Sequence, residues 1–179
     1  HDRYLISHGP DHMGLSDKVA HEELSQASLD WLATLPATQM ISGDVLLCHG
    51  TPASDDAYWL ERVDANGTVR SATLGEVAHE AKGITARLIL CAHTHIPRTL
   101  RLPGVRMIVN PCSVGCPAYD DDAPVYHHMQ TGTPNASYAI IEEREGTWTT
   151  TLRSIPYDTA KASACARAHN RHDWARALD

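Results

Sequence analysis

Three histidines follow two short apolar runs of the chain, at the point where each run ends. His49 comes after residues 45–48, and His93 and His95 come after residues 88–92. In an open α/β sheet, ligands bind beyond the carboxyl ends of the strands. Imidazole is the commonest metal-binding side chain, and it accepts zinc, iron, nickel, copper or manganese. If the two runs are neighbouring strands, this placement predicts a metal centre at one edge of the sheet.

Further polar residues near these histidines could contact an anionic ligand. Asn110 and Ser113 follow a third apolar run, where a proline makes a rigid turn that could present N–H groups or hydroxyls to an anion. Arg98 comes shortly after His95 and could bind a phosphate oxygen. His93 and His95 are separated by one residue, so in an extended segment both imidazoles would point to the same side. We therefore expect Asn110, Ser113 and Arg98 to bind substrate beside the metal.

Apolar periodicity and turn residues predict the elements that hold these side chains. Strands are expected at residues 44–48, 87–92 and 106–109, and an antiparallel hairpin at residues 138–142 and 147–152. Helices are expected at residues 24–35, 74–80, 159–169 and 173–178, and loops at residues 1–23 and 118–135. Most of the strands lack helical crossovers of a dozen residues. This order favours two mixed sheets packed together with helices outside, rather than a simple doubly wound sheet.

Two pairs of residues outside the histidine motifs have open interpretations. Tyr58 and Trp59 lie in an irregular stretch after His49, where they could stack on a substrate or pack locally. His127 and His128 lie in the acidic segment that is expected to form a surface loop. We expect both histidines to be exposed to solvent, with a contact to substrate as the alternative.

The composition limits the class of protein. The chain has 179 residues, of which 42% are apolar, and this is enough for one domain with a core. The net charge of −7 argues against nonspecific binding of nucleic acid or an anionic membrane. No apolar run approaches the roughly 18 residues of a membrane span, and no signal peptide is visible. Five cysteines, an odd number, indicate reduced thiols and a cytoplasmic location.

Four separated segments together resemble a known family. They are H-G-T-P at residues 49–52, A-H-T-H-I-P at 92–97, N-P-C-S-V-G at 110–115, and the opening pair His1 and Asp2. In this order they resemble the later motifs of the calcineurin-like metallophosphoesterases, in their small bacterial YfcE-like branch. Two positions differ, because Ala92 and Cys112 stand where the family usually has glycine. A cysteine is strained if this position requires a positive φ.

The resemblance implies a fold and a function. The fold would be a four-layer αββα sandwich of two mixed β-sheets with flanking helices, its N-terminal part missing. Residues 1–179 would form a single domain, with residues 155–179 as a helical C-terminal extension. The protein would be a dinuclear metal-dependent phosphoesterase that hydrolyses a phosphate monoester or diester with a metal-bridging hydroxide. Its substrate would be a small phosphoester or a phosphoprotein.

The resemblance also implies a role for each site residue. His49 and His93 would bind one divalent ion and His95 the other, the pair being manganese, iron, zinc or nickel. His1 would stand near the leaving-group oxygen as a catalytic residue, and Asp2 would orient His1 through a hydrogen bond. Asn110 and Ser113 would shape the floor of the pocket.

Three imidazoles alone cannot hold two divalent ions close together. Such a pair needs a bridging carboxylate to offset the repulsion between the ions, and Asp44 lies at the wrong end of its strand to supply one. The family's D-x-H and G-D motifs are not in the sequence, so we expect the bridge upstream of His1. Two alternatives stand beside this interpretation. One is a protein-binding scaffold on the same fold, and the other is a hydrolase with a single zinc ion bound by three histidines.

Overall fold

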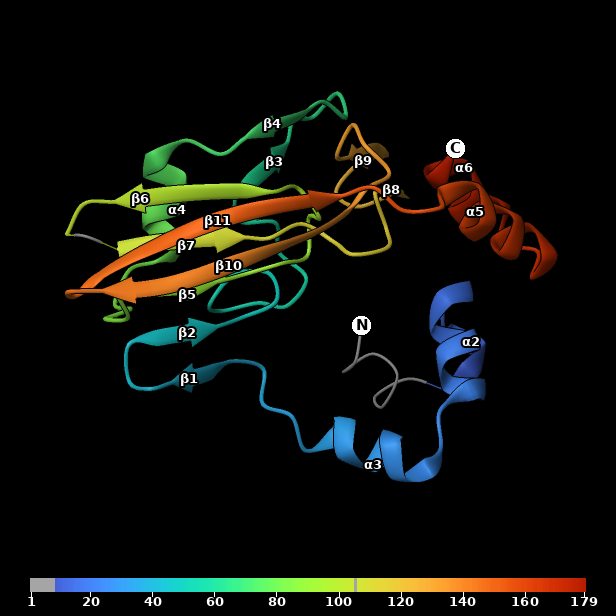
Figure 1. The fold of residues 1–179 in the computed structure, drawn as a ribbon, viewed down its shortest axis with the longest axis horizontal. Helices are drawn as coiled ribbons and strands as arrows, with labels where there is room; N and C mark the ends of the chain where they lie inside the picture. Colours follow the sequence, from blue (N-terminus) through green and yellow to red (C-terminus); the bar gives the residue numbers. More distant parts are fainter. Residues whose placement is uncertain (1–8, 105) are drawn as a thin grey trace. The chain divides into compact units, whose positions relative to one another are not determined.

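The computed structural model describes residues 9–104 and 106–179, and the chain divides into two compact units, residues 1–37 and 38–179 (Figure 1). The expected single domain is not tested by this division and stays a prediction. In the part of the chain that the structure describes, no helix has the length and apolar character of a membrane-spanning helix.

The first unit consists of short helical segments. They are a 3₁₀ turn, Pro10–His12, and two helices, α2 (Leu15–Glu23) and α3 (Gln26–Ala33). The prediction of a loop over residues 1–23 is therefore wrong where α2 stands. Lysine, glutamate and alanine favour a helix by intrinsic propensity, and neither helix buries a side chain, so α2 has no buried stripe that apolar periodicity could reveal. The Ser25 hydroxyl accepts from the Ser28 N–H, so α3 begins two residues later than expected.

A five-stranded mixed sheet forms the centre of the second unit. Its strands lie in the order β1 (Gln39–Ile41), β2 (Val45–Leu47), β5 (Leu88–Leu90), β7 (Arg106–Asn110) and β6 (Arg98–Leu102). The three central strands β2, β5 and β7 are parallel, and the two edge strands are antiparallel to them. The strands expected before His49 and before His93 are thus direct neighbours, as the metal-centre hypothesis requires.

The two faces of this sheet are covered by different elements. On one face, Leu46, Ile89 and Ile108 pack with residues of helix α4 (Leu74–Glu80) and of the segment before hairpin β3 (Glu61–Val63) and β4 (Val69–Ser71). On the other face, Leu88, Met107 and Val109 pack against the hairpin of β10 (Ala136–Arg144) and β11 (Thr147–Ile155). Successive side chains of a strand point to opposite faces, so each buried strand contributes to both cores.

The layers confirm an α/β fold with a mixed sheet. Helix α4 lies on one face of the sheet and the long hairpin β10–β11 on the other (Figure 1). Among the described residues this second layer has two strands, so a sandwich of two full mixed sheets is not clearly seen. Helices α5 (Thr159–Ala168) and α6 (His172–Leu178) confirm the helical prediction for the end of the chain.

The prediction of a surface loop over residues 118–135 is wrong. Strands β8 (Ala118–Asp121) and β9 (His127–Gln130) form an antiparallel hairpin there. In β9 the buried residues His127 and Met129 alternate with two exposed ones. This period of two marks a strand, but the polar character of His127 hid it from a pattern based on apolar residues.

Candidate metal centre

The carboxyl ends of three parallel strands bring the candidate residues to one edge of the sheet. His49 lies two residues beyond β2, His93 three residues beyond β5, and Asn110 is the last residue of β7. The ring centroids of His49 and His93 are 5.0 Å apart, with 56° between the ring planes. Two imidazoles from different strands therefore meet at the place that the sequence predicts.

The segment from His93 to His95 is not extended. Both histidines have positive φ, 65° and 58°, and the Thr94 N–H donates to the Ala92 carbonyl at 2.8 Å. The expectation of an extended segment is therefore wrong, because a tight turn forms instead. The His93 ring lies against His49 and Tyr58, whereas the His95 ring lies edge-on to Tyr119, with ring centroids 5.4 Å apart.

Each imidazole of this turn has one nitrogen on a backbone carbonyl. His93 Nε2 lies 3.1 Å from the Asp56 carbonyl oxygen, and His95 Nδ1 lies 2.9 Å from that of Cys116. A carbonyl only accepts, so these nitrogens carry the hydrogen, and Nδ1 of His93 and Nε2 of His95 keep the lone pair. Burial lowers the pKa of both histidines, which favours neutral imidazole near pH 7. Metal-binding histidines typically have this arrangement, because the carbonyl fixes the tautomer and the ring orientation.

The Asn110 side chain holds the turn from Ala92 to His95 by hydrogen bonds. Its side-chain amide donates to the Ala92 carbonyl at 2.7 Å and to the Thr94 hydroxyl at 3.0 Å, and its carbonyl accepts from the Cys112 N–H at 3.0 Å. Asn110 and Thr94 are both buried. Asn110 thus fixes the turn, and its expected roles in shaping the pocket floor and in binding substrate stay predictions.

Ser113 and Cys112 shape the loop that follows Asn110. The Ser113 hydroxyl accepts from the N–H groups of Gly115 and Cys116, which closes the loop. Cys112 is buried and has φ of 80°, so the position does require the left-handed conformation in which the family uses glycine. Positive φ in non-glycine residues costs on the order of 1–3 kcal/mol each and persists where surrounding contacts enforce it. Cys112, His93 and His95 concentrate such strain at this edge.

Arg98 has protein partners in the structure. Its guanidinium donates to the carbonyls of Leu60 and Ala72, and it lies 3.8 Å from a carboxylate oxygen of Glu61. Burial raises the pKa of Glu61, and the interaction with the Thr94 hydroxyl and the nearby charges of Arg98 and Arg62 only partly offset this. Arg98 thus connects β6 to the segment before β3, and its expected contact with a phosphate stays a prediction.

Asp44 lies at the opposite end of its strand, as predicted. Its carboxylate accepts from the Arg87 guanidinium at 2.8 Å and from the Trp148 indole at 3.2 Å. Asp44 therefore joins the sheet to the hairpin β10–β11 far from the histidines. His1 and Asp2 lie outside the described residues, and their expected roles stay predictions.

The part of the chain that the structure describes provides a partial set of metal ligands. Within residues 9–104 and 106–179, no three histidine, cysteine, aspartate or glutamate side chains are grouped so that they could hold an ion. His49 and His93 fit as two ligands of one ion, by their proximity and by the carbonyl contact of His93. A complete centre needs further donors.

A cluster of polar side chains lies beside His93, and the sequence did not predict it. His127 is buried, which corrects the expectation of a solvent-exposed histidine, and its Nε2 lies 3.0 Å from the Tyr58 hydroxyl oxygen. The Tyr58 hydroxyl donates to Asp121 at 2.9 Å, and its ring centroid lies 5.0 Å from that of His93. Trp59 instead packs in the core, and its indole donates to the Val77 carbonyl. Local packing is thus confirmed for Trp59, and a contact of Tyr58 with substrate stays a prediction.

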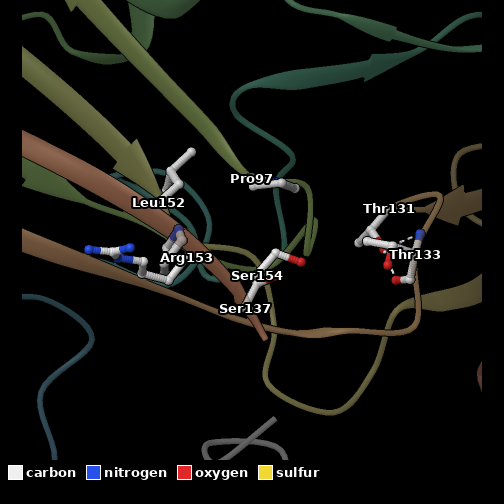
Figure 2. A pocket seen from close by; sticks show the side chains of 8 residues that line it. Pro97, Thr131, Thr133, Ser137, Leu152, Arg153 and Ser154 are labelled. Atoms are coloured by element: carbon white, nitrogen blue, oxygen red, sulfur yellow. Dashed lines mark hydrogen bonds between the residues drawn. The ribbon is translucent and has the colours of Figure 1, made fainter. Parts of the chain in front are cut away.

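A small pocket lies beside Pro97 and Pro111, in the loops that follow His95 and Asn110. It has a volume of about 160 Å³ and is lined mainly by apolar atoms, with Pro97, Pro111 and Leu152 among its walls. Figure 2 shows Thr131 and Thr133 at its rim, joined to each other by hydrogen bonds. These hydrogen bonds use part of the polar groups at the rim, and Ser137, Arg153 and Ser154 are the other polar residues of the lining.

Comparisons with known proteins identify the fold. The sequence matches no model of a protein family, and no curated protein matches it in sequence. Two solved structures resemble the chain over 99% of its length. A metallophosphoesterase from Sphaerobacter thermophilus is 22% identical, with a TM-score of 0.71 over 73% of its own chain. The hypothetical protein PH1004 from Pyrococcus horikoshii OT3 is 14% identical, with a TM-score of 0.68 over 69% of its chain. The protein therefore has the calcineurin-like metallophosphoesterase fold that its motifs predict.

Proposed function

We propose that the protein is a metal-dependent phosphoesterase that hydrolyses a phosphate monoester or diester. The observation that carries this proposal is the pair His49 and His93, which reach the same edge from neighbouring parallel strands with ring centroids 5.0 Å apart. The fixed tautomers of His93 and His95 support it, because each leaves one lone pair for a ligand. The likeness of the fold to a metallophosphoesterase agrees with it.

The chain's own residues would prepare the site in two ways. His49 and His93 would hold one divalent ion and His95 a second, with manganese, iron, zinc or nickel as candidates. Asn110 keeps the turn from residue 92 to residue 95 in its strained form, so the imidazoles need no rearrangement to bind. A bound divalent ion would polarise the phosphate and lower the pKa of a water. The second mixed sheet, a bridging carboxylate and the role of His1 belong to the same proposal.

The test compares metal content and hydrolysis in matched variants. Purified wild-type protein, H49A, H93A and the control H79A are loaded with Mn²⁺, and bound metal is measured by elemental analysis. Hydrolysis is followed with a chromogenic phosphate ester. His79 is an exposed residue of helix α4, so H79A should bind metal and hydrolyse as the wild type does. H49A and H93A should each lose at least about tenfold in metal affinity, and should lose kcat together with it. Full metal occupancy in H49A would contradict the ligand assignment.

The same measurements separate the alternatives. A mononuclear zinc hydrolase would bind one tetrahedral metal ion per chain. It would lose this ion when any one of His49, His93 and His95 is replaced by alanine. Wild-type protein that binds no metal and hydrolyses no ester would favour the binding scaffold. The variant H1A should lower kcat and leave the metal content unchanged, since His1 is proposed to act on the leaving group and not as a ligand.

A further inference from the structure

An open pocket of about 570 Å³ adjoins His93, and we call it the His93 pocket. Its polar walls are Asp56, Tyr58, Arg62, His93 and Asp121, and Val63 and Pro124 are among its apolar walls. The volume is that of a small-molecule site, and a few converging polar groups among apolar ones are typical of such sites. Because His93 is both a candidate metal ligand and a wall of the pocket, a molecule in the pocket would reach the metal site directly.

Hydrogen bonds hold the wall of the pocket that Asp121 and Tyr58 form. The Asp121 carboxylate accepts from the Tyr58 hydroxyl at 2.9 Å and from the Ala123 N–H at 3.0 Å. The Tyr119 hydroxyl lies within hydrogen-bond distance of both the Tyr58 hydroxyl and the His93 carbonyl. Burial raises the pKa of Asp121, but these donors outweigh it and lower the pKa overall. The pocket therefore presents a fixed carboxylate at neutral pH.

Among the described residues, Arg62 is the one guanidinium in the walls of the His93 pocket, and Glu80 offsets part of its charge. Its Nη1 lies within hydrogen-bond distance of the carbonyls of Tyr58, Trp59 and Glu61, and its Nη2 lies 3.9 Å from the Glu80 carboxylate. Two carboxylates of the pocket thus face one guanidinium whose charge is already shared with Glu80. The two carboxylates of Asp56 and Asp121 therefore set the sign of the potential in the pocket, and their free lone pairs can accept hydrogen bonds.

We propose that the His93 pocket binds the alcohol portion of the phosphoester, and that it selects an alcohol with hydrogen-bond donors and no negative charge. This inference rests on the proposed phosphoesterase function. Hydroxyl or ammonium groups of the alcohol would donate to Asp56 and Asp121, and the phosphate would lie at the His93 end. A carboxylate or a second phosphate on the alcohol would be repelled by both aspartates.

The test uses three phosphate monoesters that differ in the charge of the alcohol. O-phosphoethanolamine carries an ammonium group, glycerol 3-phosphate carries hydroxyls, and 3-phosphoglycerate carries a carboxylate. Dissociation constants are measured by calorimetry with the full chain in Mn²⁺, and amide NMR shifts near Ala123 locate the binding. Phosphoethanolamine should bind about tenfold more tightly than 3-phosphoglycerate, with glycerol 3-phosphate between them. Equal affinities, no binding of any probe, or a preference for 3-phosphoglycerate would overturn the proposal.

Variants show whether the two carboxylates cause the preference. D56N removes an exposed carboxylate and keeps the backbone carbonyl that His93 contacts, so it should fold and should reduce the preference severalfold. D56K should remove or invert the preference. D121N should act in the same direction as D56N. The control D122N removes the same charge from an exposed neighbour that does not line the pocket, and it should keep the preference. An equal effect of D122N would assign the preference to the general field of the protein and overturn the proposal.

Binding and hydrolysis give separate answers. The charge preference without hydrolysis of any ester would support the pocket and contradict the proposed function. Hydrolysis of all three probes at equal kcat/KM, with equal affinities, would support the proposed function and contradict the pocket.

Discussion

At the scale of single residues, Asn110 connects strand β7 to both strained loops of the candidate site. Its side chain makes three hydrogen bonds, to Ala92, Thr94 and Cys112, and it is buried. The variant N110A leaves the buried Thr94 hydroxyl without this donor and the Cys112 N–H without its acceptor. We expect it to lower the free energy of unfolding by about 2–3 kcal/mol, as measured by denaturant titration.

A local effect of N110A should accompany the loss of stability. Without the amide, the turn from Ala92 to His95 can relax from positive φ, so the NMR signals of both imidazoles should shift or broaden. The matched control is N135A, since Asn135 makes an exposed side-chain bond to Ser154 and should cost less than about 0.5 kcal/mol. Unchanged imidazole signals in N110A would show that other contacts hold the turn.

The sequence predicted the site residues only as far as strand ends and motifs allow. The positions of His49 and His93 followed from where apolar runs stop, because parallel neighbours meet at their carboxyl ends. The strain at Cys112 was predicted from a glycine that the family resemblance led us to expect. The tight turn from His93 to His95 was not predictable, because it depends on backbone angles that a short segment adopts under tertiary contacts. The burial of His127 was missed for the same reason, since its partner Tyr58 is 69 residues away.

At the scale of elements, the Asp44 and Arg87 pair joins β2 and β5 at the end away from the site. The hydrogen bond from Arg87 is the largest cause of the lowered pKa of Asp44, and the Trp148 indole adds to it. A carboxyl whose pKa is lower in the folded state stabilises the fold above its unfolded pKa of about 3.9. This stabilisation is lost as the pH falls from there through the lower folded value.

The variant D44N should therefore destabilise the protein at neutral pH and much less in acid. The difference between its denaturation midpoint and that of the wild type should be constant from about pH 5 upward and should shrink below about pH 4. In an R87Q background the same substitution should have a smaller effect, because the main partner of the carboxylate is gone. If the difference in denaturation midpoint did not vary with pH, the destabilisation would come from lost packing and not from the lost charge of Asp44.

The elements themselves were predicted with uneven success, for physical reasons. The central strands were found because their apolar residues face two cores, and the hairpin β10–β11 because its apolar residues alternate toward one core. Helix α4 was found with its start, which the Thr73 and Glu76 capping box fixes. Helix α2 and the hairpin β8–β9 were missed because their sequences are polar. No local sequence pattern predicted the order of the strands in the sheet. Only the pairing of β2 with β5 was expected, as a condition of the metal-centre hypothesis.

At the scale of the whole molecule, the division into two units predicts a difference in local stability that can be measured. Helices α2 and α3 bury no side chain, whereas Ile89 and Met107 of the central sheet are fully buried. Helices as short as these are marginal in water without packing, since most helical stability in proteins comes from burying an amphipathic face. The structure therefore predicts that residues 9–37 open locally at little cost in free energy.

Native-state hydrogen exchange measures this difference directly. Amides of α2 and α3 should have protection factors below about 10², and amides of β5 and β7 should exceed about 10⁴, because only the latter require global unfolding to exchange. Amides within β10 serve as an internal comparison, since this hairpin packs on the sheet but has one face exposed. Equal protection in α3 and β5 would contradict the division and would support a single cooperative domain from residue 9 to residue 179.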